Sequence, residues 1–155
     1  MVKIQTIQTV RKKHCALLLE ADPSWSLIED YLKRGICFEG SLDEKVVAIM
    51  VLLPTRPQTI ELVNIAVVEE RQNQGIAQEM IAFAISWACQ QKFQTMEVGT
   101  GSTGMVQLYL YQKCGFRIIG VDQDFFLRHY KEPIFENGLL LRDMVRLSIE
   151  LKEEG

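Results

Sequence analysis

The segment 71–77 carries the residues best suited to bind an anion. Its sequence, RQNQGIA, joins an apolar run at residues 61–68 to an amphipathic stretch at 74–90, a pattern that predicts a strand, a tight turn and a helix. A helix N-terminus presents free main-chain N–H groups at the positive end of the helix dipole, and Gly75 lets the main chain approach a ligand closely. The turn is therefore predicted to bind an anion, and phosphate is the expected one. It contains no Lys, which argues against a P-loop.

A second glycine-rich segment, 99–104, offers a competing nucleotide site. It reads G-x-G-x-x-G from Gly99 to Gly104, and Asp122 follows near the position of a ribose-binding acid. With Glu97 the segment also imitates the first motif of S-adenosylmethionine-dependent methyltransferases. Only 51 residues follow Gly104, too few for the βα units that a doubly wound fold needs. We expect instead a flexible turn beside the cleft where two parallel strands separate, and a plain sharp turn is the simpler alternative.

Composition and charge exclude several other classes of protein. The 155 residues fit one domain, 1–155, with the apolar and charged content of an ordinary globular protein. A net charge of −3 argues against a nucleic-acid partner. No apolar run approaches a membrane span and the start lacks a signal-peptide core, so no membrane partner and a cytoplasmic location are expected. No metal site is expected, because the two His residues and four widely spaced cysteines do not form a ligand set: Cys15, Cys37, Cys89 and Cys114.

The order of the expected elements predicts an α/β domain with a mixed sheet. Antiparallel strands come first, and a β-α-β-α-β order follows them. Strands are expected at 4–8, 36–41, 45–53, 59–68, 95–98, 117–121 and 139–151, and helices at 15–20, 24–35, 74–90 and 105–113. Residues 122–138 are expected to be irregular.

Two motifs, in order and with the appropriate elements between them, resemble those of the GCN5-related N-acetyltransferase (GNAT) superfamily. The first is Gln72-x-x-Gly75-x-Ala77, which is similar to the acyl-CoA signature Q/R-x-x-G-x-G/A. The second is LYQKCGF at 110–116, which is similar to the motif B consensus L-Y-E-K-x-G-F. Together the motifs cover about 61–116, and the longer run around them resembles a bacterial branch of the family.

The resemblance implies a single acetyltransferase domain with a mixed, mostly antiparallel central sheet flanked by helices and a parallel strand splay at the cofactor cleft. It also implies an N-acetyltransferase that uses acetyl-CoA as co-substrate and transfers the acetyl group directly to a primary amine in a ternary complex. The acceptor would be a small molecule or a peptide amine, and a homodimer is a further expectation. Two alternatives stay open: a non-catalytic acyl-CoA-binding module, and a dinucleotide or S-adenosylmethionine binder that uses 99–104.

The resemblance also assigns roles to residues of both motifs. Tyr111 matches the tyrosine that protonates the leaving thiolate, a role that suits a phenol, although a core-packing role is the alternative. Glu61 matches a general base of the histone-modifying branch, acting directly or through water, although a strand-end glutamate can equally be a solvated charge. The N–H group of Val67 is the expected donor to the thioester oxygen. The implied cofactor-binding residues are Ile65, Ala66, Val67, Gln72, Asn73, Gln74, Gly75, Ile76 and Ala77.

The acceptor side is expected to involve residues 22–33 and 122–137. Asn64 interrupts an apolar strand, and it either bonds the main chain at a bulge or faces the acceptor. The aromatic and acidic residues of 122–137 predict a pocket for a cationic amine, whereas a loop held by its aromatics and a dimer contact are the alternatives. Gly104 departs from the family, because many members carry an Asn there that contacts CoA. The candidate substrate-binding residues are Asn64, Phe126, His129 and Tyr130.

Overall fold

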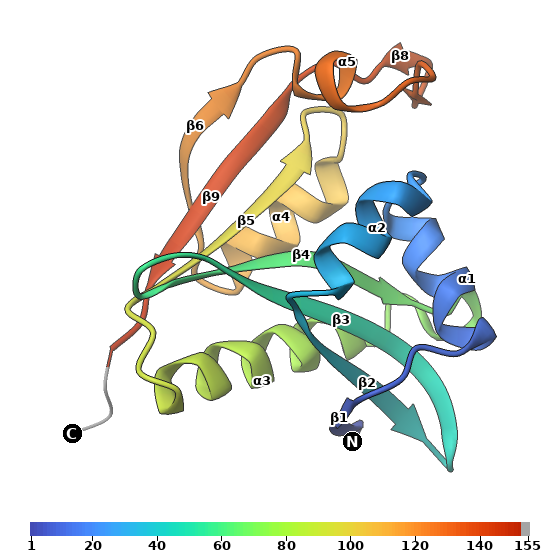
Figure 1. Ribbon diagram of the computed structural model, residues 1–155, viewed down its shortest axis with the longest axis vertical. Coiled ribbons are helices and arrows are strands. Elements are labelled where there is room, and N and C mark those ends of the chain that lie inside the picture. Colours follow the sequence, from blue (N-terminus) through green and yellow to red (C-terminus); the bar gives the residue numbers. More distant parts are fainter. Residues whose placement is uncertain (153–155) are drawn as a thin grey trace.

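A seven-stranded sheet with the strand order β1-β2-β3-β4-β5-β9-β6 forms the centre of the protein (Figure 1). The structure, a computed structural model, describes residues 1–152. The strands of this sheet are β1 Lys3–Ile7, β2 Ile36–Leu42, β3 Lys45–Arg56, β4 Thr59–Val67, β5 Thr95–Gly101, β6 Arg117–Asp122 and β9 Met144–Glu150. A small hairpin consists of β7 Phe135–Glu136 and β8 Leu139–Leu140. The helices are α1 Lys12–Ala21, α2 Trp25–Leu32, α3 Ile76–Gln90, α4 Met105–Lys113 and α5 Phe125–His129, with a 3-10 turn at Glu69–Arg71.

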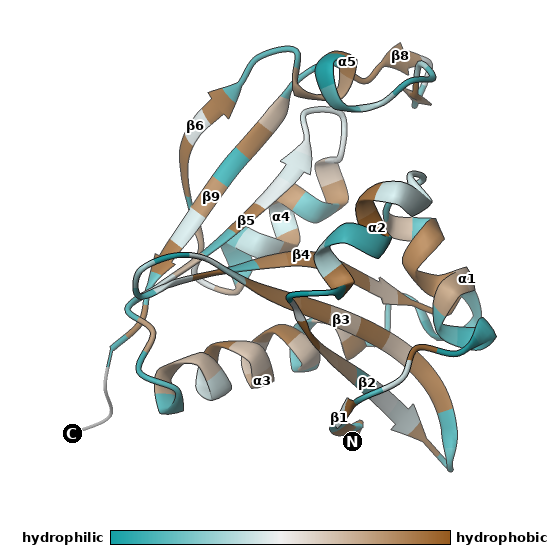
Figure 2. Cartoon of the chain, in the orientation of Figure 1, coloured by the Kyte–Doolittle hydropathy of each residue, from teal (hydrophilic) through white to brown (hydrophobic). Residues whose placement is uncertain are grey.

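Helices cover the two faces of the sheet (Figure 1), and much of the sheet between them is hydrophobic in sequence (Figure 2). Each face has its own apolar core. On the α3/α4 face, Phe38, Met50 and Leu62 pack in one buried cluster with residues of both helices. On the α1/α2 face, Ile49 and Val51 pack with residues of α1 and α2. Successive side chains of a strand point to opposite faces, so the apolar stretch 46–53 of β3 supplies both cores.

The strands β4 and β5 form the parallel pair of this sheet, and they separate partway along their length. Their pairing begins at Thr59 with Thr95 and ends at Leu62 with Val98. Beyond that point β4 continues along β3 and β5 continues along β9. The mixed, mostly antiparallel sheet with a parallel splay is therefore confirmed.

A β-bulge lies in β4 just where the two strands separate. Leu62 pairs with Leu52 of β3 and Asn64 pairs with Val51, so Val63 is an extra residue in β4. Both Val63 and Asn64 therefore face α1 and α2, and the alternation resumes with Ile65 on the α3/α4 face.

The glycine-rich segment 99–104 differs from its prediction. Gly99 and Gly101 belong to β5 and pair with β9, so the expected flexible turn is wrong for this part of the segment. A Cβ atom on Gly99 would overlap the Met144 side chain, and one on Gly101 would lie 2.5 Å from Leu141. These glycines therefore allow β9 and Leu141 to pack closely on β5.

The C-terminal region also departs from the expected boundaries. The expected strand 139–151 is interrupted, because Leu139–Leu140 pair in the separate β7–β8 hairpin and residues 141–143 lie outside any strand, where they hold the preceding loop. The main-chain N–H of Asp124 donates to the carboxylate of Asp143, and that of Phe126 donates to the carbonyl of Arg142. These contacts order α5 within the segment that was expected to be irregular.

None of the helices in residues 1–152 is long and apolar enough to span a membrane. Within the same residues, no group of three or more His, Cys, Asp or Glu side chains is arranged to hold a metal ion.

Candidate active site

The turn between β4 and α3 presents an uncapped helix N-terminus. Gly75 is the N-cap residue of α3, with a left-handed φ of 83°, and no side chain caps the helix there. A Cβ atom placed on Gly75 would meet no atom within 4 Å, so the space in front of the helix is open. Asn73 and Gln74 are exposed, whereas the side chain of Ile76 is buried in the core. This turn can therefore receive an anion on its main-chain N–H groups.

The edge of β4 beyond the bulge faces the space that β5 has left. Alternate residues of a strand direct their N–H groups to opposite sides. The N–H of Val68 donates to Val47 of β3 at 2.8 Å, so the N–H groups of Ile65 and Val67 point away from β3. Gln72 lies at the end of this edge, because its Nε2 donates to the Val67 carbonyl at 3.1 Å. The free edge thus leads directly to the turn that precedes α3.

Tyr111 is buried on the α3/α4 face, in the apolar cluster that includes Leu62 and Val98. Its side chain is 5% exposed and its ring lies 6.0 Å from that of Phe116. Burial raises the pKa of Tyr111 to about 12, so the phenol is protonated at neutral pH. Within residues 1–152 its hydroxyl makes no hydrogen bond and is therefore free to donate. The neighbouring Tyr109 is 68% exposed.

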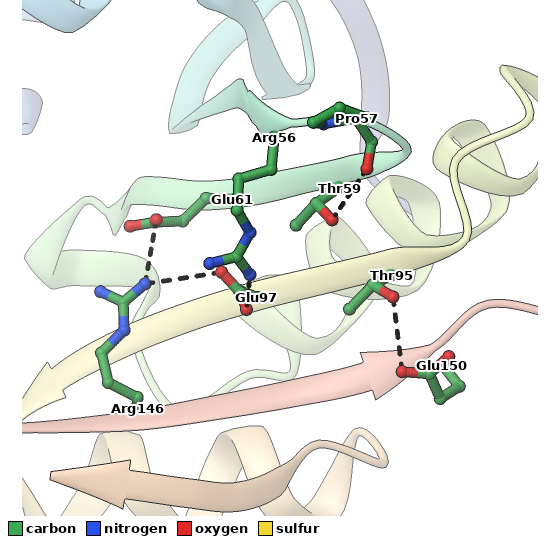
Figure 3. A network of polar contacts seen from close by, with 8 residues as sticks. All are labelled: Arg56, Pro57, Thr59, Glu61, Thr95, Glu97, Arg146 and Glu150. Atoms are coloured by element: carbon green, nitrogen blue, oxygen red, sulfur yellow. Dashed lines mark hydrogen bonds and ion pairs between the residues drawn. The ribbon is translucent and has the colours of Figure 1, made fainter.

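Glu61 belongs to a charged network on the opposite face, which we call the Arg146 network: Arg56, Glu61, Glu97 and Arg146 (Figure 3). Arg146 Nη2 lies 3.1 Å from Glu61 Oε1 and 3.7 Å from Glu97 Oε1. Arg56 Nη2 lies 2.5 Å from the other oxygen of Glu97. Two guanidinium groups therefore balance two carboxylates, beside a pocket of about 350 Å³ that β6 also lines.

The position of Glu61 limits its chemistry. It lies four positions before Ile65, a distance of roughly 13 Å along the strand. A base role at the free edge of β4 would therefore require intervening water. The local sequence signal for this network was Glu97, a charge within the apolar strand TMEV, but no local pattern identified Arg146 as its partner.

A second polar group on the α1/α2 face, which we call the Asp22 cluster, comprises Asp22, Tyr31, Asn64 and Tyr130. Asn64 Nδ2 donates to the Leu18 carbonyl at 3.1 Å and to Tyr31 Oη at 2.8 Å. Tyr31 donates to Asp22 Oδ2 at 3.3 Å, and Tyr130 donates to Asp22 Oδ1 at 2.8 Å. This geometry favours the bulge interpretation of Asn64.

The Asp22 cluster joins the two segments expected on the acceptor side. Tyr130 follows α5, whereas Asp22 follows α1, so their hydrogen bond connects regions 108 residues apart. Phe126 borders the cluster, with its ring 5.5 Å from that of Tyr130. His129 is exposed and packs on Phe125 instead, so the structure does not bring it to the cluster. Sequence reasoning included 22–33 as a border of the site but identified neither Asp22 nor Tyr31 individually.

Comparisons with known proteins agree with this arrangement. Residues 7–116 match the family model described as "Acetyltransferase (GNAT) family". The chain is 51% identical over 135 residues to the uncharacterized N-acetyltransferase YvbK of Bacillus subtilis, a match that covers 87% of each chain.

Two solved structures have nearly the same fold. A Bacillus subtilis acetyltransferase in complex with CoA has a TM-score of 0.94 and 46% identity, covering 98% of this chain and 100% of its own. A GNAT family acetyltransferase from Elizabethkingia anophelis with acetyl-CoA bound has a TM-score of 0.93 and 39% identity, covering 97% and 98%. The chain therefore belongs to the GNAT family of acetyltransferases.

Proposed function

We propose that this protein is an acetyl-CoA-dependent N-acetyltransferase that transfers the acetyl group directly to a primary amine in a ternary complex. The observation that carries the proposal is the continuous path from the free edge of β4 to the uncapped N-terminus of α3. CoA contains a pyrophosphate and an amide-bearing arm, and these two surfaces suit those two groups. The CoA and acetyl-CoA bound to the similar Bacillus and Elizabethkingia proteins support the same assignment.

The main chain of β4 and the turn would position the co-substrate. Asn73, Gln74, Gly75, Ile76 and Ala77 would contribute main-chain N–H groups to the pyrophosphate. The N–H of Gln72 donates to the Glu69 carbonyl at 3.3 Å, so Gln72 would instead support the turn through its side-chain bond to the Val67 carbonyl. Ile65, Ala66 and Val67 would pair with the arm as an added strand, and the N–H of Val67 would polarise the thioester oxygen. The thioester supplies an activated acetyl group.

Tyr111 would stabilise the sulfur as the thioester bond breaks. Its pKa of about 12 lies about three to four pH units above that of an ordinary thiol near 8.5, so complete proton transfer to a thiolate is uphill. A hydrogen bond from the phenol to the sulfur is therefore the larger part of its contribution. Glu61 would accept a proton from the amine only through water, because Arg146 holds it away from the free edge.

Calorimetric titration of acetyl-CoA into Gly75→Asp tests the proposal. Asp is one of the residues that adopt left-handed backbone most readily, and the space around Gly75 is open, so the variant should fold. Its carboxylate would stand before the N–H groups of α3 and repel phosphate. We expect acetyl-CoA affinity to fall at least about a hundredfold.

Gly138→Asp is the matched control, because Gly138 also has a positive φ and open space around it. Acetyl-CoA binding to Gly75→Asp that equals wild type would refute the proposed phosphate site. Binding of NAD or S-adenosylmethionine in place of acetyl-CoA would support the alternative at 99–104. Acetyl-CoA binding without turnover on a broad panel of amines would support a non-catalytic module.

A further inference from the structure

The Asp22 cluster lies one residue from the edge of β4 at which the thioester is proposed to bind. Asn64 precedes Ile65, and its side chain points to the α1/α2 face. On the other face the apolar core and the helices α3 and α4 fill the space against β4. An acceptor would therefore approach the thioester from the face that carries the Asp22 cluster.

The Asp22 cluster is rich in hydrogen-bond acceptors and carries a negative charge. Asp22 is 9% exposed, and in residues 1–152 no Lys, Arg or His forms an ion pair with it. Its carboxylate accepts hydrogen bonds from Tyr31, Tyr130 and the main chain of Ser24. An ionised carboxylate can accept about four, so acceptor capacity is left.

The amide oxygen of Asn64 adds a second unsatisfied acceptor. Asn64 is 4% exposed, and its Oδ1 is buried without a hydrogen-bond partner in the described part of the chain. The Leu18 carbonyl can only accept, so it fixes Nδ2 on its own side and leaves Oδ1 without a donor. A buried polar atom without a partner is costly, and a ligand N–H group would satisfy it.

Aromatic rings surround the carboxylate. Burial, and then the negative charge of Asp22, raise the pKa of Tyr130, and burial is also the main cause of the raised pKa of Tyr31. Both phenols therefore stay protonated and donate to Asp22. Phe126 packs beside Tyr130 with its ring tilted by 33°, and the faces of such rings attract cations. A negative charge, unused acceptor capacity and aromatic walls together select an ammonium group.

Resting on the proposed function, we propose that Asp22 binds a second cationic group of the acceptor, a few carbon atoms from the amine that is acetylated. Asn64 is next to Ile65, at the edge where the thioester is proposed to bind. The Asp22 carboxylate lies farther away, because two hydrogen bonds of 2.8 and 3.3 Å separate it from the Asn64 amide. This spacing supports binding of a second group of the acceptor at Asp22. The preferred substrates are therefore primary amines that carry another ammonium group.

Acetylation of 1,4-diaminobutane and n-butylamine provides the test, since these amines differ in the second ammonium group. We expect wild-type kcat/KM to be at least about tenfold higher for the diamine, as for a hydrogen bond to a charged group. Asp22→Asn should remove this preference, so that kcat/KM for the diamine falls at least about tenfold relative to kcat/KM for n-butylamine. Asp30→Asn is the matched control, because Asp30 is exposed on α2 and the change in net charge is the same.

Equal wild-type activity on the two amines would overturn the proposal, and this comparison requires no variant. An equal loss of activity on both amines in a folded Asp22→Asn protein would also overturn it, because Asp22 would then act on the reacting nitrogen. Calorimetric titration of the diamine separates this inference from the proposed function. Diamine binding that Asp22→Asn abolishes would support the site even in a protein that transfers no acetyl group.

Discussion

The two faces of the sheet differ in how many buried polar side chains they carry. On the α3/α4 face the buried cluster is apolar except for the phenol of Tyr111. On the α1/α2 face, buried His14, Asp22, Asn64 and Glu97 all make polar contacts. The proposed chemistry explains the contrast, because a thioester arm needs a dry apolar wall whereas an ammonium group needs oxygen atoms.

Within the α1/α2 face, the two polar groups differ in charge balance. The Arg146 network pairs two carboxylates with two guanidinium groups. The Asp22 cluster surrounds one carboxylate with neutral donors. The first group is satisfied within the chain and we expect it to contribute stability, whereas the second has acceptor capacity left for a ligand.

Removing the guanidinium of Arg146 should cause the largest change, a loss of unfolding free energy. Arg146→Met leaves Glu61 without its partner beside Glu97. Breaking a fully buried pair costs about 3 to 5 kcal/mol, and because the Arg146 and Glu61 side chains are 27% and 18% exposed, the loss should lie at the low end, about 3 kcal/mol. For a chain of this size the melting temperature should fall by roughly 6 to 12 °C in thermal unfolding. Arg34→Met is the control, because Arg34 and Asp30 are 61% and 67% exposed and their pair should contribute at most about 1 kcal/mol. Equal losses of stability in the two variants would contradict the expected difference between the Arg146 network and an exposed ion pair.

Removing the hydroxyl of Tyr111, the phenol buried on the α3/α4 face, should lower the rate of acetyl transfer rather than the stability. Tyr111→Phe should lower kcat about a hundredfold, equivalent to about 2.7 kcal/mol, and leave acetyl-CoA affinity unchanged. Single-turnover acetylation of n-butylamine measures this effect, and Tyr109→Phe on the exposed side of the same helix should leave the rate unchanged.

The pKa of Tyr111 adds a condition to that prediction. Because burial raises the pKa to about 12, the wild-type rate should show no alkaline decline from this group below about pH 11. An unchanged rate in Tyr111→Phe at every pH would exclude the role.

The smallest effect concerns another polar contact of the α1/α2 face, between Glu39 of β2 and His14 of α1. Burial acts to raise the pKa of Glu39, but hydrogen bonds from His14 and Gln5 outweigh it, so the pKa lies below its ordinary value. A lowered pKa gives stability that is present above the unfolded-state value near 4.5 and is lost as the pH falls through the folded-state value. Wild type should therefore lose about 1 kcal/mol of unfolding free energy in acid.

Glu39→Gln should lack this acid-dependent loss, as measured by urea unfolding at a series of pH values. Glu29→Gln, at an exposed position of α2, is the matched control and should keep the wild-type pH dependence. A wild-type pH dependence in Glu39→Gln would assign the acid loss to other carboxyl groups.

The centre of the fold could be predicted from the sequence because its signals are local. The apolar run of β4, Gly75 and the amphipathic pattern of α3 are consecutive, and each is explained by its own neighbours. The interruption of the last strand was missed, since it depends on contacts of 141–143 with Asp124 and Phe126. Glycines that admit a neighbouring side chain, such as Gly99, cannot be distinguished by sequence from glycines that form a loop.

The polar groups were harder to predict because their members are distant in sequence. Glu61 and Arg146 are 85 residues apart, and Asp22 and Tyr130 are 108 apart. No local period specifies such pairs, because sheet order and the path of α5 bring them together. The aromatic density of its segment predicts a role for Tyr130, but no local pattern marks Asp22 as its partner.

The separation of β4 from β5 also has a mechanical consequence. Within the sheet, four residue pairs between β4 and β5 join β1–β4 to the remaining strands, β5, β9 and β6. The sheet therefore consists of two halves connected by a short seam that can act as a hinge. A molecule that lies in the gap as an added strand lengthens that seam by its own hydrogen bonds. Occupancy of the gap would therefore restrict movement of one half-sheet relative to the other. That relative mobility then becomes a measure of occupancy.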